Sequence, residues 1–506
     1  MGRQESAEAI VPDRRGTGRA EHTSTRHHAM ARHGMRQKTR SPRRREQLAF
    51  DWEEAGEAQP EPSEGPTPGA APERAGALTH LMEQVVAADN MRRALKRVRA
   101  NKGSPGVDGM TVQALPEFLK MAWPGIRQAL LEGTYQPQPV KRVEIPKPDG
   151  GKRQLGIPTV GDRLVQQAIL QVLEPHYDPG FSPHSYGFRP GRSAHQALST
   201  AQAHVAGGKH WVVDLDLEKF FDRVNHDVLM GRLARRIGDR RLLRLIRRYL
   251  EAGVLLNGVV VEREEGTPQG GPLSPLLSNI LLEELDKELE KRGHSFCRYA
   301  DDCNIYVQSR RAGERVMASV VRFLETKLRL KVNREKSAVA RPSERKFLGF
   351  RIRGTEKARL SIHPKSLKRA KDTIRRITKR NRGVSFARVL ADLRTFTNGW
   401  VGYFWVAHTP SVFGELDEWT RRRLRCYQWK LWKKPRRRFL ELQKAGVGPW
   451  LAAGVAYDGP GHWRVAGCPA MTRALGNNKL QDLGFHSLRE KYAVLLQQGR
   501  ERLGLE

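Results

Sequence analysis

Two short apolar segments that carry carboxylates most strongly limit what this chain can fold into. Residues 210–216 (HWVVDLD) are a β-branched run that ends in acids, and residues 296–307 (FCRYADDCNIYV) are two apolar runs joined by a turn that holds Asp301 and Asp302. A carboxylate at the end of a buried strand is unfavourable unless a cation or a partner meets it. Because adjacent strand residues point to opposite faces, one of Asp301 and Asp302 can share a site with Asp216. The two segments therefore predict a sheet with clustered carboxylates at its end.

A glycine-rich loop followed by a helix lies between the two acidic segments. Residues 266–271 (GTPQGG) form the loop, and apolar residues from Leu273 to Leu289 recur at helical spacing. By itself, a pair of acids in a hairpin turn usually marks a solvated turn, and an apolar stripe is normally core. In this order and together, the three features fit phosphoryl transfer by two Mg²⁺ ions, which lie about 3.5–4 Å apart and need carboxylates from separate strands.

Positive charge dominates the composition. The 506 residues include 90 Lys and Arg against 55 Asp and Glu, which gives a formal net charge of +35. This excess favours a nucleic acid as the partner, with an acidic membrane surface as the alternative. The sequence shows no run of about 18 apolar residues, no apolar signal segment at its start, and no C-x-x-C pair among its four cysteines. We therefore expect a reduced cytoplasmic protein, associated with the nucleoid and not with a membrane.

The charge is unevenly distributed near the start of the chain. Residues 1–45 are strongly basic, whereas residues 46–73 contain eight acids, no Lys or Arg, and five prolines. The first 75 residues have few branched or aromatic side chains, so they cannot bury enough surface to offset chain entropy. We expect this extension to be disordered, either as a leader without a role or as an arm that touches nucleic acid.

The rest of the chain is expected to be globular. Residues 76–135 are rich in helical patterns, and residues 139–158 have the pattern of a hairpin with its turn at Asp149 and Gly150. Strand and helix segments then alternate to about residue 355, and a basic helical section follows over residues 364–440.

Several short blocks, in their order along the chain, resemble the reverse transcriptases and, among these, the group II intron maturase family. The blocks are residues 106–109 (GVDG), 145–151 (IPKPDGG), 186–193 (YGFRPGRS), 267–270 (TPQG), 299–302 (YADD) and 347–350 (FLGF), together with Asp216 followed five residues later by Phe221. The resemblance covers roughly residues 80–440. It implies an α+β fold, a right-hand polymerase with helical and hairpin fingers, a palm whose antiparallel sheet is flanked by helices, and a helical thumb and maturase domain.

The resemblance also implies a division of the chain. We expect a disordered extension, fingers, a palm, a thumb with the maturase domain, and a nucleic-acid-binding tail without an endonuclease, at residues 1–75, 76–205, 206–355, 356–440 and 441–506 respectively. Many family members end in an endonuclease with paired cysteines, but this chain has only Cys468 beyond Cys426. It therefore resembles the endonuclease-lacking branch called class C, which implies that primers come from another source.

The site residues that the resemblance implies begin with three acids. Asp216, Asp301 and Asp302 are the expected catalytic residues and, with Leu217, the expected ligands of two Mg²⁺ ions, for which Mn²⁺ can substitute. Asp216 and Asp301 are expected to bridge the ions. Phe221 is expected beneath the sugar, where it would clash with a 2′-hydroxyl, although a packed aromatic with Phe220 facing the sugar is the alternative.

Further substrate contacts are expected from two loops and the hairpin. Gln269 and Gly270 are expected to pack against the template and incoming nucleotide. Lys147, Lys152 and Arg153 flank the hairpin tip, where they could clamp a triphosphate or simply be solvated. Arg189, in a loop with Gly and Pro, could hold template or phosphate.

Two basic segments are the expected RNA-binding surface. Residues 365–382 carry nine Lys and Arg, and residues 421–438 carry ten, with Tyr427, Trp429 and Trp432 between them. Such a run is normally a solvated helix face, but bases with interleaved aromatics fit RNA phosphates and stacked bases better. The expected contacts are Lys365, Arg369, Arg421, Arg422, Lys433, Lys434 and Arg436. Trp400 and Tyr403 are expected in the core of this section.

The function implied is that of an RNA-directed DNA polymerase of a mobile group II intron. Such a protein extends a DNA primer on an RNA template with dNTPs, and binds intron RNA to assist splicing and retrohoming into target DNA. The alternatives are a retron-, CRISPR- or diversity-generating-type reverse transcriptase, and a catalytically silent RNA-binding splicing factor. The sequence leaves the oligomeric state, the intron RNA and the DNA target open.

Overall fold

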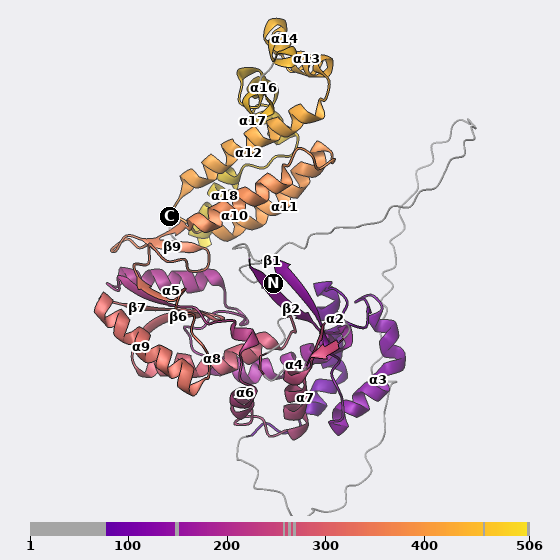
Figure 1. The fold of residues 1–506 in the computed structure, drawn as a ribbon, viewed down its shortest axis with the longest axis vertical. Helices are drawn as coiled ribbons and strands as arrows, with labels where there is room; N and C mark the ends of the chain where they lie inside the picture. Colours follow the sequence, from indigo (N-terminus) through magenta and orange to yellow (C-terminus); the bar gives the residue numbers. More distant parts are fainter. Residues whose placement is uncertain are drawn as a thin grey trace, which may run out of the picture.

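The computed structural model describes residues 77–146, 151–256, 259–261, 265–266, 270–458 and 461–502. The extension at residues 1–75 lies outside this range. In Figure 1 a lower body of helices and sheets, drawn from indigo to salmon, continues upward into a column of helices, drawn from orange to yellow. The fold is therefore the α+β arrangement that the sequence predicts, with its helical section at one end.

The lower body alternates helices with short strands. Its first elements are α1 (Leu81–Val86), α2 (Ala88–Asn101), α3 (Leu115–Glu132), β1 (Val140–Pro146), β2 (Lys152–Ile157), α4 (Val160–Tyr177), η1 (Asp178–Gly180) and α5 (Ala194–Ala206). They are followed by β3 (Trp211–Leu215), η2 (Phe220–Asp222), α6 (His226–Leu233), α7 (Arg240–Glu251), β4 (Val254–Leu256), β5 (Val259–Val261), α8 (Ser274–Lys291), β6 (Ser295–Tyr299), β7 (Asp302–Val307), α9 (Arg310–Lys327), β8 (Ala338–Ala340), β9 (Phe350–Arg353) and β10 (Arg359–Ile362).

The central sheet has the strand order β6-β7-β3-β8 with antiparallel neighbours. Its alternate residues enter two different hydrophobic cores. Val213 and Ile305 belong to the core that includes α8 and α9, whereas Val212 and Tyr306 belong to the core that includes α5, β9 and β10. Strand alternation thus makes the sheet the wall between two cores, and its residues are apolar on both faces.

The predicted hairpin is confirmed, and it forms part of a second sheet. β1 and β2 pair antiparallel with Pro146 opposite Lys152, and β1 also pairs parallel with β4, giving the order β2-β1-β4-β5. This sheet joins strands from both sides of the expected domain boundary at residue 205. The turn with Asp149 and Gly150 is not fully within the described residues.

The helical section predicted over residues 364–440 is confirmed, and the column continues with further helices that the sequence reasoning did not predict. It comprises α10 (Pro364–Ile377), α11 (Phe386–Phe404), α12 (Pro410–Leu431), α13 (Pro435–Lys444), α14 (Pro449–Tyr457), α15 (His462–Val465), α16 (Pro469–Ala474), α17 (Asn477–Asp482) and α18 (Leu488–Arg502). Proline occupies the first turn of α10, α12 and α13, where its missing N–H costs nothing. Trp400 and Tyr403 pack against the core of this column, as expected, and the Tyr403 hydroxyl donates to Leu348 O at 2.8 Å.

Within the described part of the chain, each helix is too short or too polar to cross a membrane.

Candidate active site

Asp216 lies just beyond the end of β3, beside the turn between β6 and β7. In the ladder between β3 and β7, Leu215 is opposite Cys303. One further step of this register brings Asp216 level with Asp302, the first residue of β7. Because alternate residues share a face, both acids lie on the same face of the sheet as Asp214.

Asp301 occupies the turn itself. It follows Ala300, whose φ of 57° places it in the left-handed region, and it is half-buried, whereas Asp302 is exposed. The sequence left open which of the two acids shares a site with Asp216. The register makes Asp302 its neighbour across the sheet, with Asp301 one residue away in the turn.

A loop after α9 holds the main chain of Asp216. The Asn333 N–H donates to Asp216 O at 2.8 Å, and the Asp216 N–H donates to Ser337 Oγ at 3.0 Å. Lys336 Nζ lies 3.7 Å from Asp216 Oδ2. Sequence reasoning missed these residues, because single Asn, Lys and Ser residues in a polar loop have no distinctive spacing.

Asp214, the third carboxylate on this face of the sheet, is already paired with an arginine. Asp214 accepts a hydrogen bond from Arg345 Nε at 2.7 Å. Burial raises the pKa of Asp214, Arg345 opposes that increase, and the nearby charge of Asp216 adds to it. Asp214 therefore adds negative charge to the site while its own side chain is held by a guanidinium.

Negative charge accumulates around Asp302. Its pKa is raised to about 7, first by desolvation and then by the charges of Asp301 and Asp214. Asp216 raises this pKa further, and Lys346 lowers it. The residue is nevertheless exposed, so a cation can reach it from solvent and relieve the repulsion.

The donor atoms at this edge fit a hard divalent cation. Carboxylate oxygens are the ligands that Mg²⁺ prefers, and they are presented here by β3 and by the turn before β7. The Leu217 side chain is buried in the core, so only its main chain can contribute. Among the described residues, no three His, Cys, Asp and Glu side chains are already close enough together to hold a metal ion.

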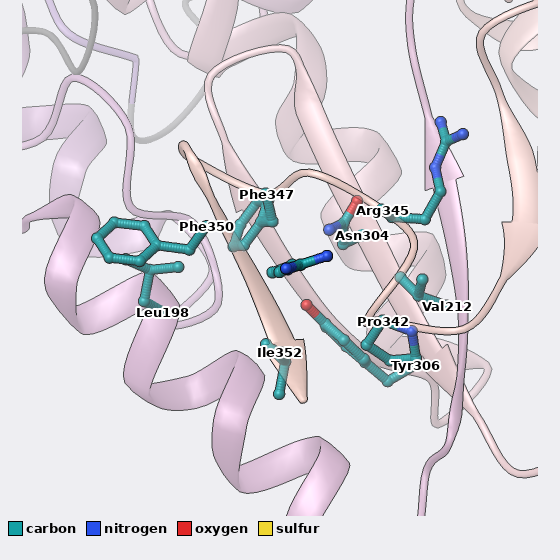
Figure 2. A pocket seen from close by; sticks show the side chains of 10 residues that line it. Leu198, Val212, Asn304, Tyr306, Pro342, Arg345, Phe347, Phe350 and Ile352 are labelled. Carbon is teal, nitrogen blue, oxygen red and sulfur yellow. The ribbon is translucent and has the colours of Figure 1, made fainter. Parts of the chain in front are cut away.

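Figure 2 shows a small hollow on the same face of the sheet, between β3, β7 and β9. Val212, Asn304 and Tyr306 face Phe347 and Ile352 across it. The buried Asn304 Oδ1 has no hydrogen-bond partner. The cavity volume of about 10 Å³ suits one water molecule and is far too small for a nucleotide.

Phe221 lies in the one-turn helix η2, a few residues after Asp216. It is half-buried, and its ring meets that of Phe220 edge-on with centroids 5.2 Å apart. Phe220 is only 2% exposed and belongs to the core. This burial argues against the alternative in which Phe220 faces the sugar, since η2 is not a strand and does not alternate the two rings across a sheet, and the role of Phe221 stays a prediction.

The loop before α8 comes close to two other segments. A Cβ at Gly266 would lie 2.8 Å from Phe221 O, and a Cβ at Gly270 would lie 2.8 Å from Gly156 O of β2. Both glycines have positive φ, so the close approach and the backbone conformation both require glycine. Gln269 lies outside the described residues, and its contact with a nucleotide stays a prediction.

The three basic residues at the hairpin are only partly within the described structure. Lys147 lies outside it. Lys152 and Arg153 belong to β2, opposite Pro146 and Ile145, but their side chains are not among the described atoms. The triphosphate clamp therefore stays a prediction.

Arg189 is a structural residue in this fold. It is 4% exposed, and its guanidinium donates to Asp178 Oδ1 at 2.7 Å and to the carbonyls of Ser182 and Ser185 at 2.6 and 3.0 Å. A guanidinium committed in this way is not presented to template or phosphate. The expected substrate contact is corrected accordingly: sequence alone could not show that the loop folds over its own arginine.

The first basic segment forms an exposed helix face. Lys365 and Arg369 lie on α10 and are both exposed, while Ala370 and Ile374 on the opposite face are buried. This is the arrangement expected of a helix that could present cations to RNA phosphates.

The second basic segment is divided between packing and exposure. Arg422 lies 4.5 Å from the Trp463 ring centroid and donates to Trp463 O at 3.2 Å. Arg421 lies over the Phe485 ring at 5.7 Å, 3.9 Å from an oxygen of Asp417. Both arginines are half-buried and hold α12 against the later helices, so their expected RNA contact is corrected.

The aromatic residues of this segment are core residues as well. Tyr427, Trp429 and Trp432 are 1%, 3% and 5% exposed, so they cannot stack on RNA bases as the sequence pattern indicated. Of the cations that the sequence predicts to contact RNA, Lys433, Lys434 and Arg436 around the start of α13 are exposed, as are Lys430 and Arg437.

A buried ion pair beneath the acidic turn also escaped sequence reasoning. Arg298 of β6 and Asp286 of α8 are both fully buried and pair through two hydrogen bonds. The sequence feature that could have revealed this ion pair is the arginine inside the apolar run 296–307, because a charge within a buried strand requires a partner.

Two family descriptions match the chain. Residues 145–352 match "Reverse transcriptase (RNA-dependent DNA polymerase)", and residues 367–446 match "Group II intron, maturase-specific domain". The first range contains all three acids of the site, and the second contains the exposed face of α10 and most of the α12–α13 region.

The chain is also similar to individual proteins and to a solved structure. Protein YkfC of Escherichia coli is 34% identical over 316 residues, which are 54% of this chain and 83% of that protein. The group II intron-encoded protein LtrA of Lactococcus lactis is 41% identical over 211 residues, 42% of this chain but only 35% of that protein. A solved structure, a partial Cas6-RT-Cas1–Cas2 complex, is similar with a TM-score of 0.33 and 27% identity, covering 49% of this chain and 43% of that one.

Proposed function

The chain belongs to the group II intron reverse transcriptase and maturase family, and we propose that it extends DNA primers on RNA at the carboxylate end of the central sheet. The observation that carries this proposal is the register, which brings Asp216 level with Asp302 and beside Asp301. In a protein of net charge +35, clustered carboxylates would weaken the binding of a polyanion unless cations met them. This favours the enzyme over a silent RNA-binding splicing factor.

Asp216, Asp301 and Asp302, with the main chain of Leu217, would hold two Mg²⁺ ions, or Mn²⁺ in their place. Divalent cations bound there supply charge stabilisation on phosphoryl oxygens and help to ionise the primer 3′-hydroxyl. The protein contributes rigid placement: the strand fixes Asp216, the turn fixes Asp301 and Asp302, and the loop at Asn333–Ser337 fixes the main chain of Asp216.

The substrate contacts follow the same geometry. Phe221, five residues after Asp216, would exclude a 2′-hydroxyl, and Gly270 with Gln269 would pack against the template and incoming dNTP. Lys147, Lys152 and Arg153 would contact the triphosphate from the hairpin. Arg189 is left out of this set because the fold itself uses its guanidinium.

The domains are proposed on the same basis. Residues 76–205 would be the fingers, 206–355 the palm, 356–440 the thumb and maturase domain, and 441–506 a nucleic-acid-binding tail, with residues 1–75 a disordered extension. Because β1 pairs with β4, the sheet of the proposed fingers includes strands from the proposed palm segment. Helix α5, although nearly all of it lies in the proposed fingers range, packs against the central sheet in the core that also contains β9 and β10.

The proposed partners are group II intron RNA, an RNA template with its DNA primer, and target DNA, met in the cytoplasm at the nucleoid. Lys365 and Arg369 on α10, with Lys433, Lys434 and Arg436 near α13, are the proposed RNA contacts. A retron-, CRISPR- or diversity-generating-type reverse transcriptase is the alternative, and the genomic neighbourhood distinguishes these: a surrounding intron ribozyme supports the maturase.

Primer extension on poly(rA)/oligo(dT) tests the proposal. The wild-type protein should extend the primer with Mg²⁺, and Asp301→Asn and Asp302→Asn should each lose activity on the order of 10²–10³-fold. Equal activity in the wild type and both variants would remove the metal assignment, and an inactive wild type would remove the polymerase itself.

A further inference from the structure

The turn that presents Asp301 and Asp302 rests on a buried polar cluster. Arg298, in the strand before the turn, is 0% exposed. Its Nε and Nη2 donate to the two carboxylate oxygens of Asp286 at 2.7 and 2.6 Å, and its Nη1 donates to Asn279 Oδ1 at 3.0 Å. The same Nη1 donates to Ala300 O, within the turn, at 2.9 Å.

This last hydrogen bond controls the direction of the turn. The Ala300 carbonyl and the Asp301 N–H belong to one planar peptide unit, so fixing the carbonyl fixes the plane from which Asp301 departs. Ala300 itself has a φ of 57°, a left-handed conformation that residues with a Cβ seldom adopt. An inward-facing carbonyl held by a guanidinium is therefore what keeps this strained residue in place.

The turn is also held from its other side. A Cβ at Gly187 would lie only 2.2 Å from Ala300 N, so the loop at residues 184–187 lies directly on the turn. Asn279 connects the two sides, because its amide donates to Gly187 O at 2.9 Å while its oxygen accepts from Arg298. The β6 main chain pairs with the same loop through the Tyr186 N–H and Arg298 O, at 2.9 Å.

A fully buried ion pair is a weak way to stabilise a fold, because desolvation offsets most of the attraction, and apolar residues of similar volume often do as well. Its position here, with one donor reaching into the turn, is what an apolar pair could not reproduce. We infer that Arg298, held by Asp286 and Asn279, is a positioning residue for the polymerase reaction, which sets the peptide plane from which the metal-binding acids project.

This inference rests on the proposed polymerase function, and its test separates the two. The first variant is the double replacement Arg298→Met with Asp286→Leu, which keeps the buried volume but removes the hydrogen bond to Ala300 O. The second is Arg298→Lys, which keeps the charge beside Asp286 but lacks the planar fork that reaches both Asp286 and Ala300. Arg425→Met is the control, since it removes another buried guanidinium, one that donates to Leu475 O in the helical column.

Thermal unfolding, primer–template affinity, and single-nucleotide kcat as a function of Mg²⁺ concentration are measured for each protein. The double variant should remain folded and bind primer–template within about twofold of wild type, but lose kcat on the order of 10²-fold and need more Mg²⁺. Arg298→Lys should retain part of the lost kcat at a Tm close to that of wild type. Arg425→Met should lower Tm and leave the kcat of the folded protein unchanged.

Three outcomes would overturn the inference while leaving the polymerase proposal intact. They are a folded double variant with the kcat of wild type, a wild-type kcat in Arg298→Lys, and a loss of activity that follows only the loss of folded protein. If the double variant does not fold, Arg298→Lys alone decides. A wild-type protein that does not extend primers contradicts the proposed function instead.

Discussion

The central sheet and the helical column use charged side chains in opposite ways. At the sheet, a few acids are brought together by strand register, and desolvation followed by their mutual repulsion raises the pKa of Asp302 to about 7. In the column, a much larger number of cations is dispersed, and several of them pack against the protein's own rings and carbonyls, such as Arg422 on the ring of Trp463 and the buried Arg425 on Leu475 O. Catalysis is expected where like charges are held close together in space. The number of charges in a segment does not show how many can reach a ligand.

The largest effect that separates the two regions should come from Asp216. Asp216→Asn should lower primer extension on the order of 10²–10³-fold, because it removes a proposed cation ligand, while affinity for intron RNA stays within about twofold. Extension assays and RNA binding on the same preparation measure both. A parallel decrease in RNA affinity would mean that the two regions are not separable.

The next prediction compares the aromatic residues of the two regions. Phe221→Ala should increase ribonucleotide use on the order of 10- to 100-fold, because Phe221 is the proposed sugar gate and is only half-buried, unlike the buried tryptophans of the column. The measurement is the ratio of kcat/KM for dNTP and rNTP.

Phe220→Ala is the matched control for Phe221. Phe220 lies in the core, so its truncation should cost about 3–5 kcal/mol of unfolding free energy without changing sugar choice. If only this variant changed the ratio of kcat/KM for dNTP and rNTP, Phe220 would be the residue that excludes ribonucleotides.

The exposed cations of the column give a smaller effect. Replacing Lys433, Lys434 and Arg436 together with Gln should weaken intron RNA binding about tenfold, and it should reduce the log–log salt slope by about one unit for each phosphate that the variant no longer binds. Arg421→Gln with Arg422→Gln should instead lower Tm, because these side chains pack against later helices. An equal reduction of the salt slope in both variants would show that half-buried arginines also bind RNA.

Primer extension on a generic template, measured for the same variants, distinguishes a surface that binds intron RNA from one that holds the primer–template duplex during polymerisation. The triple variant should keep extension on poly(rA)/oligo(dT). An unchanged salt slope together with an inactive polymerase would place the region around α13 in the grip on the primer–template duplex.

The smallest effect is expected from the extension, which belongs to neither region. A protein lacking residues 1–75 should stay soluble and retain extension activity within about twofold, since the basic and acidic parts of this segment balance and few of its residues could form a core. Solubility and steady-state kinetics of the truncated protein check this. Aggregation or an inactive product would assign the segment a structural role.

Sequence reasoning succeeded where short-range pattern decides structure. The hairpin at residues 139–158 and the helix over Leu273–Leu289 follow from periodicity and turn chemistry, and the structure has them, whereas the proximity of Asp216 to the acidic turn was expected from the order of the segments and the family resemblance. These features depend on residues close together in the chain or on one strand pairing.

Sequence reasoning failed to predict whether long side chains are exposed to solvent or packed against the protein. Arg189 and Arg422 have the same sequence signature as RNA-binding arginines, but the guanidinium of Arg189 is bound by carbonyls of its own loop, and that of Arg422 packs on the ring of Trp463 in a later helix. The burial of Trp429 likewise depends on helices that follow it. Such choices are made by tertiary packing, which no local pattern encodes.

The strand order of the central sheet has a consequence for how the protein is made. β3 lies between β7 and β8, and Ala338, which pairs with Asp214, is added to the chain about 120 residues later. At translation rates of about 5–20 residues per second, the ribosome needs roughly 6 to 24 s to supply that partner. Before β7 is made, the acid-bearing strand β3 has neither neighbour, and until β8 is made it lacks the second one. A truncated translation product that ends before β7 therefore cannot compete with the full-length protein as a polymerase, although it carries Asp216.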